Sequence, residues 1–265
     1  MEIGISTASF FRKQYNEDAL VTLNEMDSRV CEVFLETFCE YTPGYGELLK
    51  SRKGNLKVHS IHTLNTHFEP QLFSDNVRAY GDAVKIFRDT LYVAKLLGAH
   101  NYTMHGRARF KQNMKFDNYA DIGKRFDELT KITGEYGVNL CIENVAWAFY
   151  NQVGFFGKIK DYAPDLKTCL DIKQAFDSGY TWQEYFAEMG DRLKTVHLSD
   201  RDESGKLCLP GKGIFDFETL FGILKDNGFD GNMLIEVYDE NFKTVDELKR
   251  SLDYLRNIAA RFDFK

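Results

Sequence analysis

Positive charge is in short supply in this chain. Its 34 Lys and Arg residues are outnumbered by 40 Asp and Glu residues, which gives a formal net charge of -6. Surfaces that bind nucleic acid are usually basic, so we expect no nucleic-acid partner. No apolar run approaches the roughly 20 residues that span a bilayer, and the first residues lack the basic-then-apolar layout of a signal peptide. We therefore expect no membrane partner.

Cysteine pairs and glycine-rich motifs are also missing. The five cysteines are odd in number and form no C-x-x-C pair, which favours buried free thiols in a reducing cytoplasm. No G-x-G-x-x-G motif or P-loop is present, so a nucleotide cofactor is not indicated. No Pro-, Gly- or Ser-rich linker divides the chain, and we expect a single domain over residues 1–265. The expected location is cytoplasmic.

What the sequence does contain is an alternation of short apolar segments and amphipathic segments. The expected strands cover residues 3–7, 30–35, 56–62 and 101–105, and four more end at Glu143, Asp171, His197 and Glu236. The expected helices cover about 16–26, a short stretch ending near 50, 77–97, 118–136, 153–162, 182–189, 217–227 and 245–262. Such alternation predicts a parallel sheet with crossover helices. Repeated about eight times in 265 residues, it favours an α/β fold, a single-domain (β/α)8 TIM barrel.

Local signals mark several helix ends and faces. The helix over 77–97 is expected to bury one face through residues that step by three and four: Val77, Tyr80, Val84, Phe87, Leu91 and Ala94. Gly98 is expected to end this helix, as a glycine just past a C-terminus commonly does. Asn16 is expected to cap the N-terminus of the first helix.

Four of the expected strands end on a side chain that can bind a metal. Glu143, Asp171, His197 and Glu236 close four successive strands, and the C-terminal strand ends of such barrels meet at the active-site face. Taken singly, each residue has a simpler structural explanation. Taken together, three converging carboxylates would repel one another without a cation between them. One imidazole and three carboxylates suit a divalent ion such as Mn²⁺, Mg²⁺, Co²⁺ or Zn²⁺.

Two histidines hold the same place on earlier strands. His62 and His105 end the third and fourth expected strands, so they are predicted to face the same mouth. A lone strand histidine is more often a hydrogen-bonded core residue than a ligand, and that alternative stays open for both.

The chain resembles the xylose-isomerase-like barrel superfamily, in the branch of sugar isomerases and epimerases related to AP endonucleases. The resemblance covers nearly the whole length, and its most specific segments are residues 142–144, 170–171, 197–200, 209–213 and 235–236. It implies that Glu143, Asp171, His197 and Glu236 are the ligands of one divalent metal ion. It also implies that Glu143 and Glu236 form an acid/base pair and that His62 and His105 are the family's strand-three and strand-four histidines.

Three departures from the family pattern bear on specificity. Gln174, preceded by Lys173, stands where a histidine usually follows the strand-six Asp. Residues 206–208 read Lys-Leu-Cys where the endonucleases need Asp-x-His, which argues against a three-zinc site for cleaving abasic DNA. Arg201 lies in the loop where carbon-3 epimerases carry an Arg, and a different position within that loop is the alternative.

Other loop residues are candidates for contacting a substrate. Lys173, Arg107, Arg201 and Lys212 could meet a phosphate or carboxylate, although solvated loop cations are an equally good explanation. Trp147, Phe110 and Phe38 could form an apolar wall, with lid or core packing as the alternative. The full set expected to bind substrate is His62, His105, Gln174, Lys173, Arg201, Lys212 and Trp147.

These features predict a metal-dependent isomerase or epimerase that acts on a sugar or sugar phosphate by proton transfer through an enediolate. An inosose-type dehydratase would use the same site. An AP-site endonuclease is disfavoured, and a non-catalytic sugar-binding barrel is the third alternative. Assembly into a homo-oligomer stays open.

Overall fold

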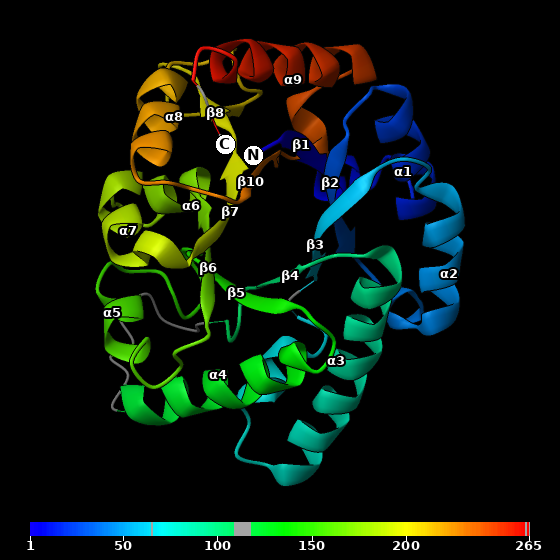
Figure 1. Ribbon diagram of the computed structural model, residues 1–265, viewed down its shortest axis with the longest axis vertical. Helices are drawn as coiled ribbons and strands as arrows, with labels where there is room; N and C mark the ends of the chain where they lie inside the picture. The colour runs from blue at the N-terminus through cyan, green and yellow to red at the C-terminus, as the bar shows by residue number, and fades with distance from the viewer. Residues whose placement is uncertain (65, 109–117, 263, 265) are drawn as a thin grey trace.

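The eight strands expected from the sequence close into a parallel barrel, in the order β1-β10-β7-β6-β5-β4-β3-β2 (Figure 1). The structure is a computed structural model that describes residues 1–64, 66–108, 118–262 and 264. The barrel strands are β1 (Ile3–Ser6), β2 (Val30–Leu35), β3 (Lys57–Thr63), β4 (Asn101–Met104), β5 (Asn139–Glu143), β6 (Lys167–Asp171), β7 (Leu193–Leu198) and β10 (Asn232–Ile235). Pairing of β1 with both β2 and β10 closes the ring. The fold is therefore the predicted single-domain (β/α)8 TIM barrel.

Helices surround the strands on the outside, as Figure 1 shows. They are α1 (Asn16–Glu25), α2 (Pro43–Arg52), α3 (Val77–Leu97), α4 (Tyr119–Gly134), α5 (Phe155–Ile159), α6 (Ile172–Asp177), α7 (Trp182–Met189), α8 (Phe217–Asp226) and α9 (Val245–Ala259). Each helix that covers the sheet turns an apolar face toward it, and that burial drives the packing. Within the described part of the chain, no helix has both the length and the apolarity for a membrane crossing.

The expected buried face of α3 is confirmed only in its C-terminal part. Phe87, Leu91 and Ala94 are fully buried, and Gly98 ends the helix in the left-handed region at φ 73°. Val77 is 81% exposed, so its assignment to the buried face is wrong. A helix of 21 residues is roughly 31 Å long, whereas the four-residue β4 that follows it is less than half that length. The strand β4 therefore cannot cover the whole length of α3.

The expected N-cap of the first helix is also wrong. Tyr15 holds the N-cap position of α1, and Asn16 is the first helical residue. The Asn16 side chain is buried, where it donates to the backbone carbonyl of Phe34 (2.8 Å) and accepts from the Thr7 hydroxyl (2.5 Å). An amide that joins three elements across the barrel rim cannot also cap its own helix.

One hairpin was not expected from the sequence. After β7 the chain forms β8 (Asp200–Arg201) and β9 (Leu207–Cys208), which pair antiparallel. The buried carboxylate of Asp200 then accepts backbone N–H groups of Gly211 (3.0 Å), Gly213 (3.1 Å) and Phe215 (2.9 Å). This carboxylate fixes the Pro-Gly-Lys-Gly loop, because each bond holds a separate backbone position.

Candidate metal centre

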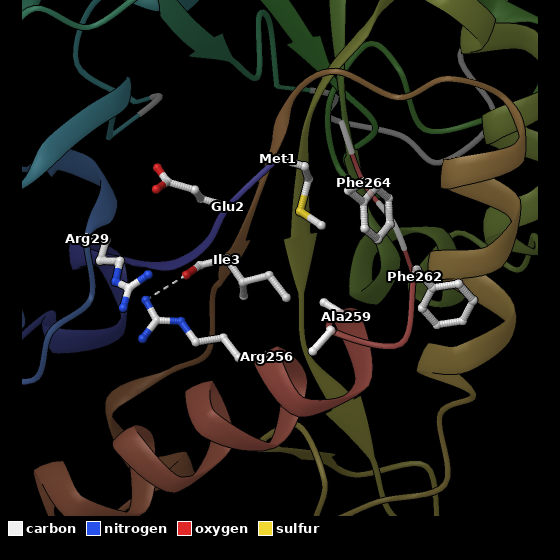
Figure 2. A pocket seen from close by; sticks show the side chains of 9 residues that line it. Met1, Glu2, Ile3, Arg29, Arg256, Ala259, Phe262 and Phe264 are labelled. Atoms are coloured by element: carbon white, nitrogen blue, oxygen red, sulfur yellow. Dashed lines mark hydrogen bonds between the residues drawn. The ribbon is translucent and has the colours of Figure 1, made fainter.

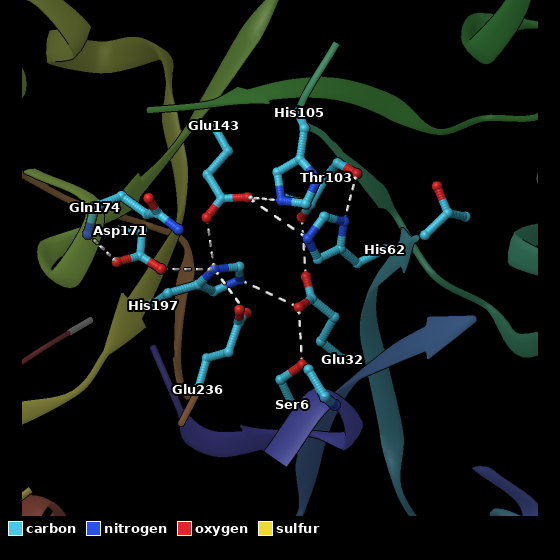
Figure 3. Close-up of polar contacts among 12 residues, drawn as sticks. Ser6, Glu32, His62, Thr103, His105, Glu143, Asp171, Gln174, His197 and Glu236 are labelled. Atoms are coloured by element: carbon cyan, nitrogen blue, oxygen red, sulfur yellow. Dashed lines mark hydrogen bonds and ion pairs between the residues drawn. The ribbon is translucent and has the colours of Figure 1, made fainter. Parts of the chain in front are cut away.

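The four predicted ligands lie at the C-terminal ends of four neighbouring barrel strands. Glu143 ends β5, Asp171 ends β6, His197 is the penultimate residue of β7, and Glu236 directly follows β10. The barrel order places these strands side by side, and Asp171 and His197 are register partners. Figure 3 shows the four side chains turned toward one another inside the barrel mouth.

Their polar atoms gather around one nitrogen of His197. Nδ1 lies 2.9 Å from Glu236 Oε2, 3.4 Å from Glu143 Oε1 and 3.9 Å from Asp171 Oδ2. Ligand atoms roughly 2.0 to 2.2 Å from a shared ion lie about 3 to 3.5 Å from one another, so small side-chain shifts would bring these atoms into range. The ligand atoms of Glu143, Asp171 and His197 lie within 4.8 Å of one another, as do those of Glu32, His197 and Glu236. Glu143 Oε2 and Glu236 Oε2 are buried and accept no hydrogen bond from any described residue. Buried carboxylate oxygens that accept no hydrogen bond are costly, so the cluster fits a divalent cation.

The pKa values of the cluster reflect the crowding of its charges. Burial, together with the charges of Glu143 and Glu236, raises the pKa of Asp171 to about 7 against the opposing effect of Lys173. Burial would also raise the pKa of Glu143, but the imidazoles of His105 and His197 outweigh it and hold that pKa well below its usual range. Both groups respond to their neighbours in the direction expected for a site that concentrates charge.

His62 and His105 approach the same carboxylate from the other side. His105 Nε2 lies 3.1 Å and His62 Nε2 lies 3.6 Å from Glu143 Oε2. His62 Nδ1 donates to the carbonyl of Thr103 (3.0 Å), which leaves Nε2 as an acceptor when the ring is neutral. A neutral His62 and an ionised Glu143 then both present acceptors to one point, where a substrate hydroxyl or a cation would satisfy them.

Lys173 and Gln174 lie beside the cluster, at the start of α6. The buried ammonium of Lys173 is 3.7 Å from Asp171 Oδ2 and 4.7 Å from the centre of the Tyr238 ring. Asp171 Oδ1 accepts the backbone N–H of Gln174 (2.8 Å), while Gln174 Oε1 accepts the N–H of Ala146 (3.1 Å). The glutamine that replaces the family's histidine thus ties α6 to the loop after β5.

The remaining candidates are distributed around the mouth. Arg201 donates to the carbonyl of Gly205 (2.7 Å), pairs with Asp177 (2.5 Å) and covers the ring of Phe176 (4.1 Å). These contacts engage its guanidinium on the hairpin. Lys212 is exposed on the loop after β9, where it borders a cavity of about 500 Å³.

The aromatic candidates lie in different places. Trp147 is 42% exposed and meets the ring of His105 edge-on at 4.9 Å, which places it at the mouth. Phe38 stacks on His67 with ring centres 4.6 Å apart. Arg107 is exposed, and Phe110 lies outside the described residues.

One buried charged residue of the candidate site was missed in the sequence. Glu32 of β2 is fully buried beneath the cluster, and its Oε1 lies 3.2 Å from His197 Nε2 (Figure 3). The signal was available, because Glu32 is the only charged residue in the otherwise apolar segment Val30–Leu35. A lone charge inside a buried strand needs a partner, and that requirement predicts a polar site.

Cavities at the two ends of the barrel differ in chemistry. A cavity of about 600 Å³ adjoins the mouth and is lined by Lys173, Phe176, Trp182 and residues 199–205, among others. The cavity in Figure 2, of about 360 Å³, lies where β1 begins and is lined by Met1, Arg29 and Arg256 among others. There Arg256 donates to backbone carbonyls such as that of Ile3 (3.2 Å), so this end closes the barrel base. Active sites of such barrels lie at the opposite, C-terminal end, where the candidate metal ligands gather.

Known proteins share this fold along almost the entire chain. Residues 22–258 match the family described as xylose isomerase-like TIM barrel. The inosose dehydratase of Histophilus somni (strain 129Pt) is 24% identical in an alignment of 279 residues, gaps included. The alignment covers 89% of this chain and 91% of that protein. A D-psicose 3-epimerase, solved in the presence of D-fructose, has a TM-score of 0.78 at 14% identity, with 98% of this chain and 99% of that chain covered. The IOLI protein with a bound zinc atom has a TM-score of 0.78 at 15% identity, with 99% of each chain covered. The chain belongs to the xylose isomerase-like TIM barrel family.

Proposed function

We propose that the protein is a divalent-metal-dependent isomerase or epimerase of a sugar or sugar phosphate. The observation that carries the proposal is the approach of the buried carboxylates of Glu143, Asp171 and Glu236 to Nδ1 of His197, where Glu143 Oε2 and Glu236 Oε2 accept no hydrogen bond from the described residues. The activities named for the similar proteins, a sugar 3-epimerase and an inosose dehydratase, support a carbohydrate substrate.

All four residues would hold the ion. When bound, the ion supplies Lewis-acid stabilisation of the negative charge that develops on the substrate as a proton leaves carbon. Mn²⁺, Mg²⁺, Co²⁺ and Zn²⁺ all suit three carboxylates and one imidazole. The zinc atom named for the IOLI structure is consistent with that range.

Glu143 and Glu236 are assigned the proton transfers. They lie on the two outer strands of the four-strand series, β5 and β10, with Asp171 and His197 between them. A substrate lying across the series would have one glutamate on either side. One carboxylate removes the proton next to the carbonyl and the other returns a proton, which epimerises or isomerises the sugar through an enediolate.

Neighbouring side chains would orient the substrate. His62 and His105 present ring nitrogens beside Glu143, and Trp147 offers an apolar face at the rim. Lys173 offers a buried ammonium next to Asp171, where it offsets part of the carboxylate charge and can donate to a substrate oxygen.

A dehydratase is the second candidate, because the matched inosose dehydratase aligns with most of this chain. The first step would be the same removal of a proton next to a carbonyl. The second glutamate would then protonate a departing hydroxyl, and water would be lost. Mass spectrometry separates the two outcomes, since an epimerase conserves substrate mass and a dehydratase lowers it by one water.

The decisive experiment measures deuterium wash-in from solvent into a panel of ketoses and inososes, beside metal content. Glu143→Gln and Glu236→Gln should each slow exchange by about 10²- to 10⁴-fold, because the base is removed while one oxygen still binds the metal. Asp171→Ala and His197→Ala are the comparison variants and should lose metal together with activity. Exchange at the wild-type rate in either glutamine variant would refute the acid/base assignment.

A further inference from the structure

Glu32 is a buried carboxylate whose hydrogen-bonding capacity is almost fully used by the barrel. Oε1 accepts from the hydroxyl of Ser6 (3.0 Å), and Oε2 accepts from those of Ser60 (2.7 Å) and Thr103 (2.9 Å). These donors come from β1, β3 and β4, so the carboxylate joins three strands to its own β2. A side chain held from three directions has a fixed orientation.

The one acceptor position left on Glu32 faces the underside of His197. Its Oε1 lies 3.2 Å from His197 Nε2, and both side chains are at most 1% exposed. The N–H direction is not aligned with this oxygen, so the contact is an ion pair by distance and falls short of a full hydrogen bond. An ionised carboxylate accepts only, so the nitrogen beside it is stabilised when it carries a proton.

The other nitrogen of the same ring has the opposite environment. His197 Nδ1 is surrounded by carboxylate oxygens of Glu143, Asp171 and Glu236, within 3.9 Å or less. Glu32 approaches the Nε2 edge of the ring, whereas these three carboxylates approach its Nδ1 edge. A cation on the upper side needs the lone pair of Nδ1, and Nδ1 has that lone pair only if the neutral ring keeps its proton on Nε2.

We propose that Glu32 is a positioning residue that keeps the proton of His197 on Nε2 and thereby presents Nδ1 to the metal ion. This inference rests on the proposed function, since it assigns a role toward the same ion. Glu32 itself is not a ligand in this arrangement. Its oxygens already accept three hydroxyl groups, and its contact with His197 is at Nε2, not at Nδ1. Glu32, His197 and Glu236 also lie close enough together to hold an ion, so direct ligation by Glu32 is the alternative that the experiments below exclude or establish. Partners of this kind typically change metal affinity by about 10- to 100-fold when removed.

The first measurement needs no variant. In the zinc-loaded protein with ¹⁵N-labelled histidine, two-dimensional NMR should show His197 with its proton on Nε2 and zinc on Nδ1. A proton on Nδ1 with zinc on Nε2 would overturn the inference, as would a zinc-bound crystal structure in which Glu32 contacts the ion.

The second measurement compares zinc dissociation constants, obtained by competition with a chromophoric chelator, among variants. Glu32→Ala should raise the constant by about 10- to 100-fold. Glu32→Gln, which keeps an oxygen acceptor but loses the charge, should weaken binding less. Thr103→Val is the matched control: it removes one hydroxyl from the same carboxylate, leaves the contact with His197 in place, and should stay near the wild-type value.

The outcomes separate the inference from the proposed function. If wild-type protein binds no divalent ion, the proposed metal centre fails and the inference fails with it. If wild-type protein binds zinc and both Glu32 variants bind it equally well, the inference alone is wrong. A loss of thermal stability without a change in zinc affinity would likewise reduce Glu32 to a structural role.

Discussion

Acidification is expected to release the metal in two proton-linked steps, because two of the proposed ligands gain protons at accessible pH. Burial raises the pKa of Asp171 to about 7 in the metal-free protein. Burial would lower the pKa of His197, but Cys169 and the surrounding carboxylates, foremost Glu236, raise it well above its ordinary value. A ligand must be deprotonated at its donor atom to bind a cation, so binding must expel these protons.

The expected slope follows from counting those protons. Below pH about 7, each unit of acidification should weaken metal binding by about tenfold through Asp171 and by a further tenfold through His197, or about 100-fold together. Above pH about 7, Asp171 is already ionised, so only the tenfold change in metal affinity per pH unit that comes from His197 remains. Each tenfold step corresponds to about 1.4 kcal/mol of binding free energy.

A chelator competition at pH about 6, 7 and 8, with proton release followed by an indicator dye, measures both quantities. Asp171→Asn is the control variant, since it binds the metal more weakly but should show only the single-proton slope. Affinity that stays flat between pH about 6 and 8, with no proton released on binding, would refute this account of the site.

Two further predictions concern stability. Burial lowers the pKa of His59 to about 4, whereas an unfolded histidine titrates near 6.5. The contribution of His59 to the free energy of unfolding is therefore complete above pH about 6.5 and declines as the pH falls toward 4. The loss should reach roughly 3 kcal/mol in denaturant titrations, and His59→Gln should flatten the dependence; an equally steep curve for that variant would contradict the assignment. Gly213→Ala should destabilise by about 1 to 3 kcal/mol, because a Cβ there would lie 2.1 Å from Arg201 O and 2.3 Å from Asp200 Oδ1. Gly134→Ala, where a Cβ meets nothing within 4 Å, is the control for thermal unfolding; equal melting temperatures for the two variants would count against the prediction.

The strand pattern could be predicted because each barrel strand is an apolar run that ends in a turn or a polar residue. That pattern placed Glu143 and Asp171 at strand ends to the residue, while β10 ends at Ile235, one residue before Glu236. Parallel strands then bring their C-terminal ends to one face regardless of details of pairing. The closeness of the four polar side chains therefore followed from topology alone.

The parts that escaped prediction depend on contacts between distant segments. Asn16 has the residue type of an N-cap, but its amide is used by Thr7 and Phe34 instead. The role of Glu32 depends on hydroxyls that reach it only when β1, β3 and β4 are in register, and the register shifts beside Glu32. No periodicity within one segment contains that information.

Hydrogen bonding differs between the carboxylate of Glu32 and the carboxylates of Glu143 and Glu236. At the lower level, Glu32 is surrounded by hydroxyl donors, and its charge needs no added ligand. At the upper level, Glu143 Oε2 and Glu236 Oε2 are buried without hydrogen-bond donors among the described residues. The cationic groups beside them, His197 and the ammonium of Lys173, offset only part of the combined charge. Among the described residues, hydrogen bonds are therefore more complete around Glu32 than around Glu143 and Glu236, although His197 Nε2 also lacks one. This difference favours entry of a cation and its substrate from the C-terminal mouth. Apolar replacement of Glu32 should impair the positioning of His197, whereas replacement of Glu143 or Glu236 should remove proton transfer itself.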